Sequence, residues 1–135
     1  VGLGTFKPIT EKNIESGKLH TEFLEIKPEV ANRLNLAKRQ GKRIIAVGTT
    51  TVRTLESMTS DDGILQSGSK NTNIFIYPPY KFKFVDSLIT NFHLPKSSLL
   101  MLIAAMMGDE WKEVYKLAVK NKYRFFSFGD AMWIR

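Results

Sequence analysis

The stretch RIIAVGTTTVRTLESM, residues 43–58, decides the fold class of this chain. It opens with a short apolar run at 43–47, which is typical of a strand buried on both faces. A turn of small residues follows, and from Val52 to Met58 apolar residues recur at helical spacing. A strand, a tight turn and a helix in this order predict an α/β sheet.

Strands and helices also alternate outside this stretch. We expect further strands or extended segments at 20–26, 73–77, 82–86 and 124–128. Helices are predicted after Pro28, over the apolar run 99–107 with Ser97 or Ser98 as its cap, and after a capping Asp109. The fold class is therefore α/β, with a partly parallel open sheet and flanking helices. The chain starts at Val1 inside an apolar run, so we expect the sheet to be incomplete without an upstream half.

Composition narrows the function. The chain has 135 residues, 43% of them hydrophobic, and no cysteine, which excludes a disulfide scaffold, a thiolate metal site and a cysteine nucleophile. Its net charge of +7 favours polyanionic partners, although solubility alone is an alternative explanation. The two histidines, His20 and His93, lie far apart in the sequence, so we expect no metal. The longest apolar run is too short to span a bilayer, and we expect a cytoplasmic protein without a membrane partner.

Three polar clusters follow predicted strands, where open α/β sheets bind ligands. The first contains Thr49, Thr50 and Arg53, whose hydroxyls, guanidinium and helix N-terminus suit a phosphate or carboxylate. Helix capping by a threonine is the alternative. The second cluster runs from Asp86 to Ser97 and is expected to be a loop between a strand and a buried helix.

That loop contains Asn91 and His93, and a histidine between apolar neighbours is either a structural residue or a catalyst. The third cluster is Asp130 after the last predicted strand, together with His20 and Glu22 near the start of an earlier one. A turn residue at Asp130 and a surface residue at His20 are the alternatives.

Read in order, six segments resemble the S-adenosylmethionine:tRNA ribosyltransferase-isomerase family of queuosine biosynthesis. They are VGLGTF (1–6), HTEF (20–23), AVGTTTVRTLES (46–57), TNIFIYPPY (72–80), VDSLITNFHLPKSSLLML (85–102) and YRFFSFGDAMWI (123–134). The resemblance covers essentially the whole chain, and its last two strings are long and specific.

The resemblance implies a reaction and a fold. Members of the family transfer and isomerise the ribosyl group of S-adenosylmethionine onto 7-aminomethyl-7-deazaguanine at the wobble position in the tRNA anticodon loop. They release adenine and methionine and need no metal, so S-adenosylmethionine is a substrate that donates the ribosyl group. The family fold is an α/β domain interrupted by an inserted β-barrel. Residues 1–135 correspond to the C-terminal portion of the α/β domain, and the barrel is expected to be absent.

Within the matched motifs, residue chemistry suggests roles. His93 or Asp86 suits proton transfer, and Arg53 with Thr49 and Thr50 suits the methionine carboxylate or a tRNA phosphate. Asn91 and Asp130 suit hydrogen bonding to the ribose or to a base edge. Two other interpretations stay open, namely a non-catalytic RNA-binding α/β module and an α/β enzyme that acts on a different nucleotide.

Overall fold

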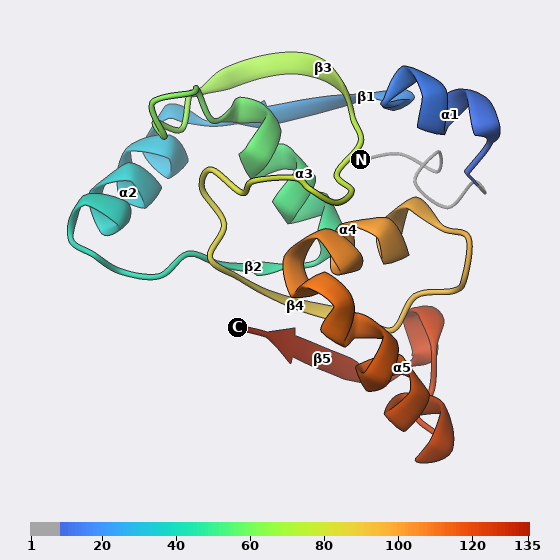
Figure 1. The fold of residues 1–135 in the computed structure, drawn as a ribbon. Helices are drawn as coiled ribbons and strands as arrows, with labels where there is room; N and C mark the ends of the chain where they lie inside the picture. The colour runs from blue at the N-terminus through green and yellow to red at the C-terminus, as the bar shows by residue number, and fades with distance from the viewer. Residues whose placement is uncertain (1–8) are drawn as a thin grey trace.

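The computed structural model describes residues 9–135 as an α/β arrangement of five strands, five α-helices and two short 3₁₀ turns (Figure 1). In chain order these elements are α1 (Glu11–Ser16), β1 (Lys18–Ile26), α2 (Pro28–Arg39), β2 (Ile45–Val47), α3 (Thr49–Met58), β3 (Gly68–Ile74), β4 (Ser87–Asn91), α4 (Ser98–Met107), η2 (Gly108–Glu110), α5 (Trp111–Lys120), η3 (Phe126–Phe128) and β5 (Ala131–Ile134). The motif at 1–6 lies outside the described residues.

The strands form two separate sheets. β2, β4 and β5 make a three-stranded sheet in which β4 is central, parallel to β2 and antiparallel to β5. β1 and β3 form an antiparallel two-stranded ribbon. The predicted partly parallel sheet is therefore confirmed.

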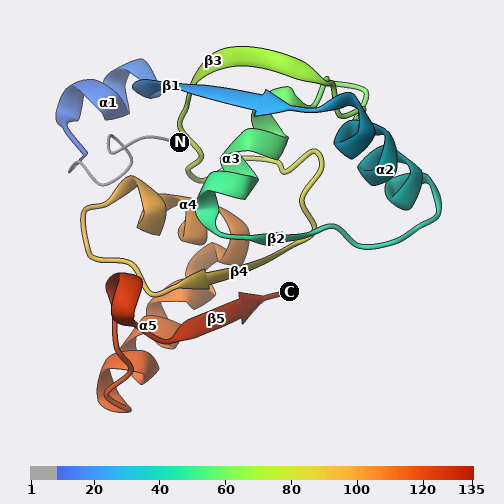
Figure 2. The ribbon, with the colours of Figure 1, turned by 180° about the vertical axis from the view of Figure 1, so that it is seen from behind.

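Helix α3 lies between the two sheets, as both ribbon views show (Figures 1 and 2). It packs on strands of each sheet, and Val52 on this helix is completely buried. The core continues through Leu88 of β4 to Ile103 of α4, and neither side chain is exposed. α3 is thus the element around which the rest of the chain is organised.

The helix signals in the sequence are largely confirmed. α2 begins at Pro28, and α4 is capped by Ser97, whose hydroxyl accepts a hydrogen bond from the N–H of Leu100. Asp109 does not cap α5, because a 3₁₀ turn precedes that helix and the Asp109 carboxylate pairs with Lys112. Within residues 9–135, no helix is long and apolar enough to cross a membrane.

The strand signals were less accurate. The segment 43–47 is not buried on both faces, because β2 is an edge strand whose Ile45 and Val47 side chains are 43% and 67% exposed. Helices cover one face of this sheet, and the side chains of Ile45 and Val47 point to the other. The expected strand at 73–77 is also displaced, since the polar segment of β3 pairs with β1 and ends at Ile74.

Two further corrections concern the sheet that carries the predicted site. The expected loop from Asp86 to Ser97 contains the central strand β4, which pairs on both sides. The expected last strand at 124–128 ends in a 3₁₀ turn instead, and the strand follows at Ala131–Ile134. Asp130 therefore precedes a strand and does not follow one.

Candidate functional site

Most of the predicted site residues lie along one edge of the three-stranded sheet. β2 and β4 are parallel, so their carboxyl ends share this edge, and the N–H of Gly48 donates to the carbonyl of Ile89 at 2.8 Å. β5 is antiparallel, so its amino end joins them, with Asn91 opposite Ala131 (Figure 2). We call this group the carboxyl-edge site, and its members are Thr49, Thr50, Thr90, Asn91, His93 and Asp130.

The first component of the site is the N-terminus of α3. The residue before the helix is Gly48, at φ 85°, a left-handed conformation that favours glycine. The Thr51 hydroxyl donates to the Val47 carbonyl at 2.7 Å and holds the turn between strand and helix. Gly48 is thus the helix cap. The alternative interpretation, in which a threonine caps the helix, is wrong. The N-terminal N–H groups of the helix, together with the exposed Thr50, can bind an anion.

Asn91 and Asp130 are connected across β4 and β5. The Asn91 side-chain N–H donates to the backbone carbonyl of Asp130 at 3.3 Å. The Asp130 carboxylate accepts hydrogen bonds from the backbone N–H of Arg124 at 2.8 Å and from its guanidinium at 3.1 Å. These bonds, the backbone one first, lower the pKa of Asp130. Asp130 therefore closes the turn that leads into β5, as one of the two interpretations of the sequence anticipated.

His93 follows β4 and is held at both its backbone and its ring. Its backbone N–H donates to the Tyr115 hydroxyl at 3.1 Å, and its ring Nε2 lies 3.1 Å from the Thr90 hydroxyl. Burial lowers the pKa of His93 to about 4, because desolvation disfavours the charged ring. The imidazole is consequently neutral at physiological pH, and it is a weaker base than an exposed histidine.

An aromatic cluster fixes the position of this histidine. Phe92, next to it, packs against Tyr115, Tyr123 and Phe125 with ring centroids 5.3–5.6 Å apart. Tyr115 is a buried residue of α5, and the sequence does not predict its polar contact with His93. That contact spans 22 residues, and no local spacing indicates it. The contact between Thr90 and His93 could have been predicted from the sequence, since the two residues are only three positions apart.

Arg53 is not at this edge. Its side chain is buried in the space between α3 and β1, where its Nη1 lies 2.5 Å from Oε2 of Glu22, and the two side chains are only 4% and 5% exposed. Glu22 thus pairs with Arg53, although the sequence grouped it with Asp130. His20 is exposed on β1. The third predicted cluster does not form.

Asp86 also lies away from the site, at the amino end of β4. Its carboxylate pairs with Lys38 at 2.7 Å and accepts a hydrogen bond from the N–H of Ile44, also at 2.7 Å. Six residues separate it from His93, and the five of them that form β4 span about 17 Å along the sheet. The structure therefore places the two predicted proton-transfer residues at opposite ends of one strand.

Comparisons with known proteins show the family of this chain. A family model described as "Queuosine biosynthesis protein" matches residues 1–134. The S-adenosylmethionine:tRNA ribosyltransferase-isomerase of Natranaerobius thermophilus is 54% identical over the whole chain, which covers 40% of that protein. The protein of the same name from Fusobacterium nucleatum is 57% identical over 99% of the chain and 38% of its own length.

A solved structure is also similar. The S-adenosylmethionine tRNA ribosyltransferase of Thermotoga maritima superposes with a TM-score of 0.75 at 50% identity, over 84% of this chain and 40% of that one. The chain thus spans about 40% of the length of the relatives that it matches. With a family match over nearly all of its residues, the chain belongs to the queuosine biosynthesis protein family.

Proposed function

We propose that this chain forms part of an S-adenosylmethionine:tRNA ribosyltransferase-isomerase. The proposed enzyme transfers and isomerises the ribosyl group of S-adenosylmethionine onto 7-aminomethyl-7-deazaguanine in the anticodon loop of tRNA. One observation carries the proposal: three motif segments that are far apart in the sequence supply side chains to a single sheet edge. Because the chain spans about 40% of its relatives, we propose that the remainder of the family-length protein completes the site.

The first proposed role belongs to the start of α3. The methionine part of the donor ends in a carboxylate, and a helix N-terminus attracts such an anion through its N–H groups and its dipole. The Thr49 and Thr50 hydroxyls would add hydrogen bonds to this carboxylate, or to a tRNA phosphate. Arg53 would then act indirectly, since its buried pair with Glu22 holds α3 against β1.

The second proposed role is proton transfer by His93. The sulfonium of the donor acidifies the adjacent 5′ carbon, so a base can remove a proton there and leave an ylide. Ring rearrangement then expels adenine, the aminomethyl nitrogen bonds to the ribosyl carbon and loses a proton to solvent, and methionine leaves as a neutral thioether when the epoxide closes. Because burial disfavours a charged ring, His93 would hold the proton only briefly and pass it to the departing adenine.

The third proposed role is recognition by Asn91. Its side-chain N–H already donates to the carbonyl of Asp130, which fixes the orientation of the amide. The amide oxygen is then the atom that would accept a hydrogen bond from a ribose hydroxyl or a base edge. Asp130 would contribute by holding the neighbouring turn in place.

Adenine release tests the proposal. A family-length protein that contains this chain is mixed with S-adenosylmethionine, with and without tRNA that carries the aminomethyl base. We expect donor binding, and adenine release only when tRNA is present. Salt-sensitive tRNA binding without donor binding would support the non-catalytic RNA-binding module instead, and a protein that binds neither the donor nor tRNA would support an enzyme that acts on a different nucleotide.

A further inference from the structure

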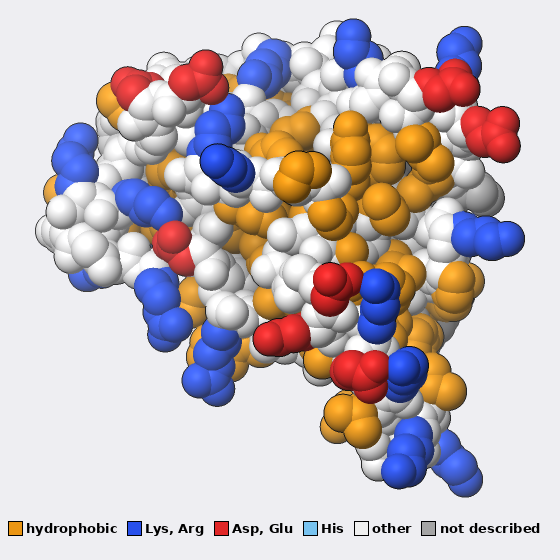
Figure 3. Space-filling model, in the orientation of Figure 1, with side chains coloured by type: hydrophobic (Ala, Val, Ile, Leu, Met, Phe, Trp, Pro, Cys, Tyr) orange, Lys and Arg blue, Asp and Glu red, His pale blue; other side chains and the backbone are white. Residues whose placement is uncertain are grey.

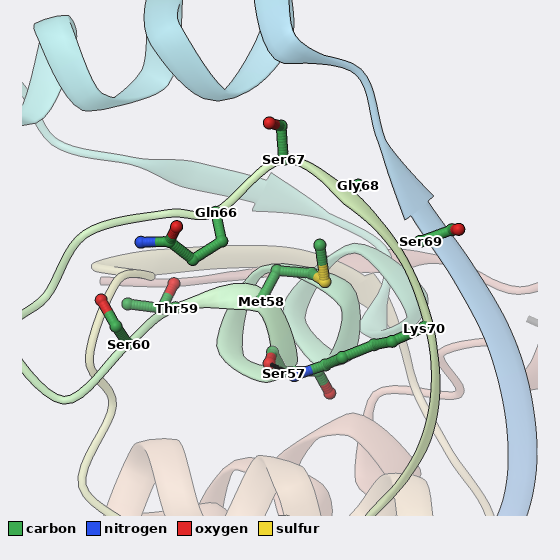
Figure 4. Close-up of a pocket in the computed structure, with 9 residues that line it drawn as sticks. All are labelled: Ser57, Met58, Thr59, Ser60, Gln66, Ser67, Gly68, Ser69 and Lys70. Atoms are coloured by element: carbon green, nitrogen blue, oxygen red, sulfur yellow. Dashed lines mark hydrogen bonds between the residues drawn. The ribbon is translucent and has the colours of Figure 1, made fainter.

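A polar groove lies away from the carboxyl-edge site, between β3 and the segment that follows it. It has a volume of about 600 Å³, and the C-terminal half of α3 forms its floor. A smaller hollow of about 300 Å³ continues it around the end of this helix, where Lys70 reaches across to Ser57 (Figure 4). We call the two together the β3 groove. They share Ser57 and Lys70.

One wall of the groove is fixed by a buried carboxylate. Glu56 is 1% exposed and accepts hydrogen bonds from the backbone N–H groups of residues 83, 84 and 85 at 2.8–3.0 Å. It also accepts one from the Tyr80 hydroxyl at 3.0 Å. Burial and the neighbouring Glu56 charge raise the pKa of Tyr80, so this hydroxyl remains a donor. The wall from Tyr80 to Lys83 is therefore held in one conformation before any ligand arrives.

Three lysines surround the groove. Lys70 extends from β3 to the Ser57 carbonyl, and Lys83 extends from the opposite wall to the Thr59 carbonyl at 2.9 Å. Lys81 is exposed, and it has no ion pair or side-chain hydrogen bond to any described residue. Of the acidic side chains among the described lining residues, Glu56 is buried and only Asp61 is exposed. The accessible charge of the groove is thus positive. Figure 3 shows this face, with Lys and Arg side chains beside a central apolar area.

Helix capping explains only part of this arrangement. Lys70 and Lys83 bind carbonyls at the C-terminal end of α3, where cations stabilise a helix. Such a cap satisfies the carbonyls but leaves the Lys70 charge in place, whereas Lys83 also pairs with the exposed Asp61 at 3.4 Å. It also gives no reason for Lys81, nor for the two amide residues of β3 that line the groove, Asn71 and Asn73. Thr72 between them is buried, and its hydroxyl lies 2.7 Å from that of Ser57.

We propose that the β3 groove binds the sugar–phosphate backbone of the RNA substrate. Lysines neutralise phosphates and release counterions, while amides and hydroxyls hydrogen-bond to phosphate and ribose oxygens without reading sequence. Thr49 and Ser57 lie eight residues apart on α3, about 12 Å along its axis, so one RNA molecule can reach both places. The inference rests on the proposed function, because it assigns an additional surface to the same substrate.

The salt dependence of tRNA binding tests this surface. Binding is measured on the family-length protein between about 50 and 200 mM salt, where each lost phosphate contact changes the slope of log affinity against log salt by about one. Lys81→Gln is the main variant, since it breaks no bond in the fold. Lys70→Gln/Lys81→Gln adds a second lysine, with thermal unfolding as a check on folding. Lys120→Gln, at the exposed end of α5, is the matched control.

We expect the slope to become shallower by about one for Lys81→Gln and by about two for the double variant, with a several-fold loss of tRNA affinity. The Lys120→Gln control should keep the parental salt slope and tRNA affinity. The affinity for S-adenosylmethionine should be the same in every variant. If the parent protein binds tRNA and both variants keep its slope, the groove proposal fails and the proposed function stands. If the parent does not bind tRNA, both fail. If polyglutamate displaces tRNA from the parent protein at the same concentration as unlabelled tRNA, the surface is a general polyanion site. This result would also overturn the groove proposal.

Discussion

The backbone N–H of His93 donates a hydrogen bond to the Tyr115 hydroxyl, with 3.1 Å between the two atoms. This contact ties the segment after β4 to α5, and it lies beneath the imidazole that we assign to proton transfer. Burial raises the pKa of Tyr115, which keeps the phenol protonated in the core. The position of the proposed catalytic ring therefore depends on a residue from a helix that follows it in the chain.

Removing that hydroxyl should loosen the site. Tyr115→Phe keeps the ring packed against Phe92 but leaves the His93 N–H without its acceptor, which costs about 1–3 kcal/mol of unfolding free energy. We expect lower turnover with little change in the KM for tRNA. Tyr123→Phe is the matched control, because Tyr123 belongs to the same aromatic cluster and is more exposed. Equal stability and turnover in the two variants would contradict the positioning role.

Acid should destabilise the fold through His93. Its pKa is about 4 in the folded chain, against 6.5 for an ordinary histidine. Between those values the unfolded chain binds a proton that the folded chain does not, so the unfolding free energy falls as the pH drops from about 6.5 to about 4. Chemical denaturation across this range measures it. The unfolding free energy of His93→Gln should change less with pH. An identical change in the parent and in the variant would show that His93 does not have a lowered pKa in the fold.

Gly129 should tolerate no side chain. A Cβ atom added there would lie 2.3 Å from the carbonyl oxygen of Arg124, inside the turn that Asp130 closes. Overpacking of this kind costs about 1–3 kcal/mol. We expect Gly129→Ala to lower the unfolding free energy by that amount, measured by denaturant titration, whereas Ser127→Ala in the same exposed turn should change it little. A fully stable Gly129→Ala variant would show that the turn can move.

Glu56 should be the most important acidic residue for stability. Its two oxygens serve three backbone N–H groups and the Tyr80 hydroxyl, and an amide in its place would set an N–H group against these donors. Glu56→Gln should therefore cost on the order of 3 kcal/mol. The same change at Glu113, an exposed partner of Lys116, should cost roughly 0–1 kcal/mol. Similar thermal stability for the two variants would show that the hydrogen bonds of Glu56 do not stabilise the fold.

Local signals in the sequence were sufficient for the starts of α2 and α4, though not for α1 or for the cap of α5. Pro28 and Ser97 mark the starts of α2 and α4 because proline and serine act through their own backbone or the adjacent turn. The positions of strands depend on distant partners instead. β3 pairs through a polar segment because β1 lies beside it, and apolar content at 73–77 gave no sign of this.

The candidate site divides in the same way. The turn at Gly48 was predicted, since a strand end followed by small residues is a local pattern. The polar segment from Asp86 to Ser97 was predicted as a loop, although it contains β4. The burial of Arg53 was not predicted, because its partner Glu22 lies 31 residues earlier, on β1. Asp86 was placed in the site by its carboxylate and its position in the same motif as His93, whereas β4 separates the two residues.

The most direct test of the account compares two variants of the family-length protein in tRNA-dependent adenine release. The carboxyl-edge site contains His93 but not Asp86. We therefore predict that His93→Gln lowers turnover by about 100-fold or more, the usual contribution of a positioned acid or base, while Asp86→Asn keeps turnover within a few-fold of the parent. A folded His93→Gln protein with parental turnover, or a large loss only in Asp86→Asn, would contradict the account.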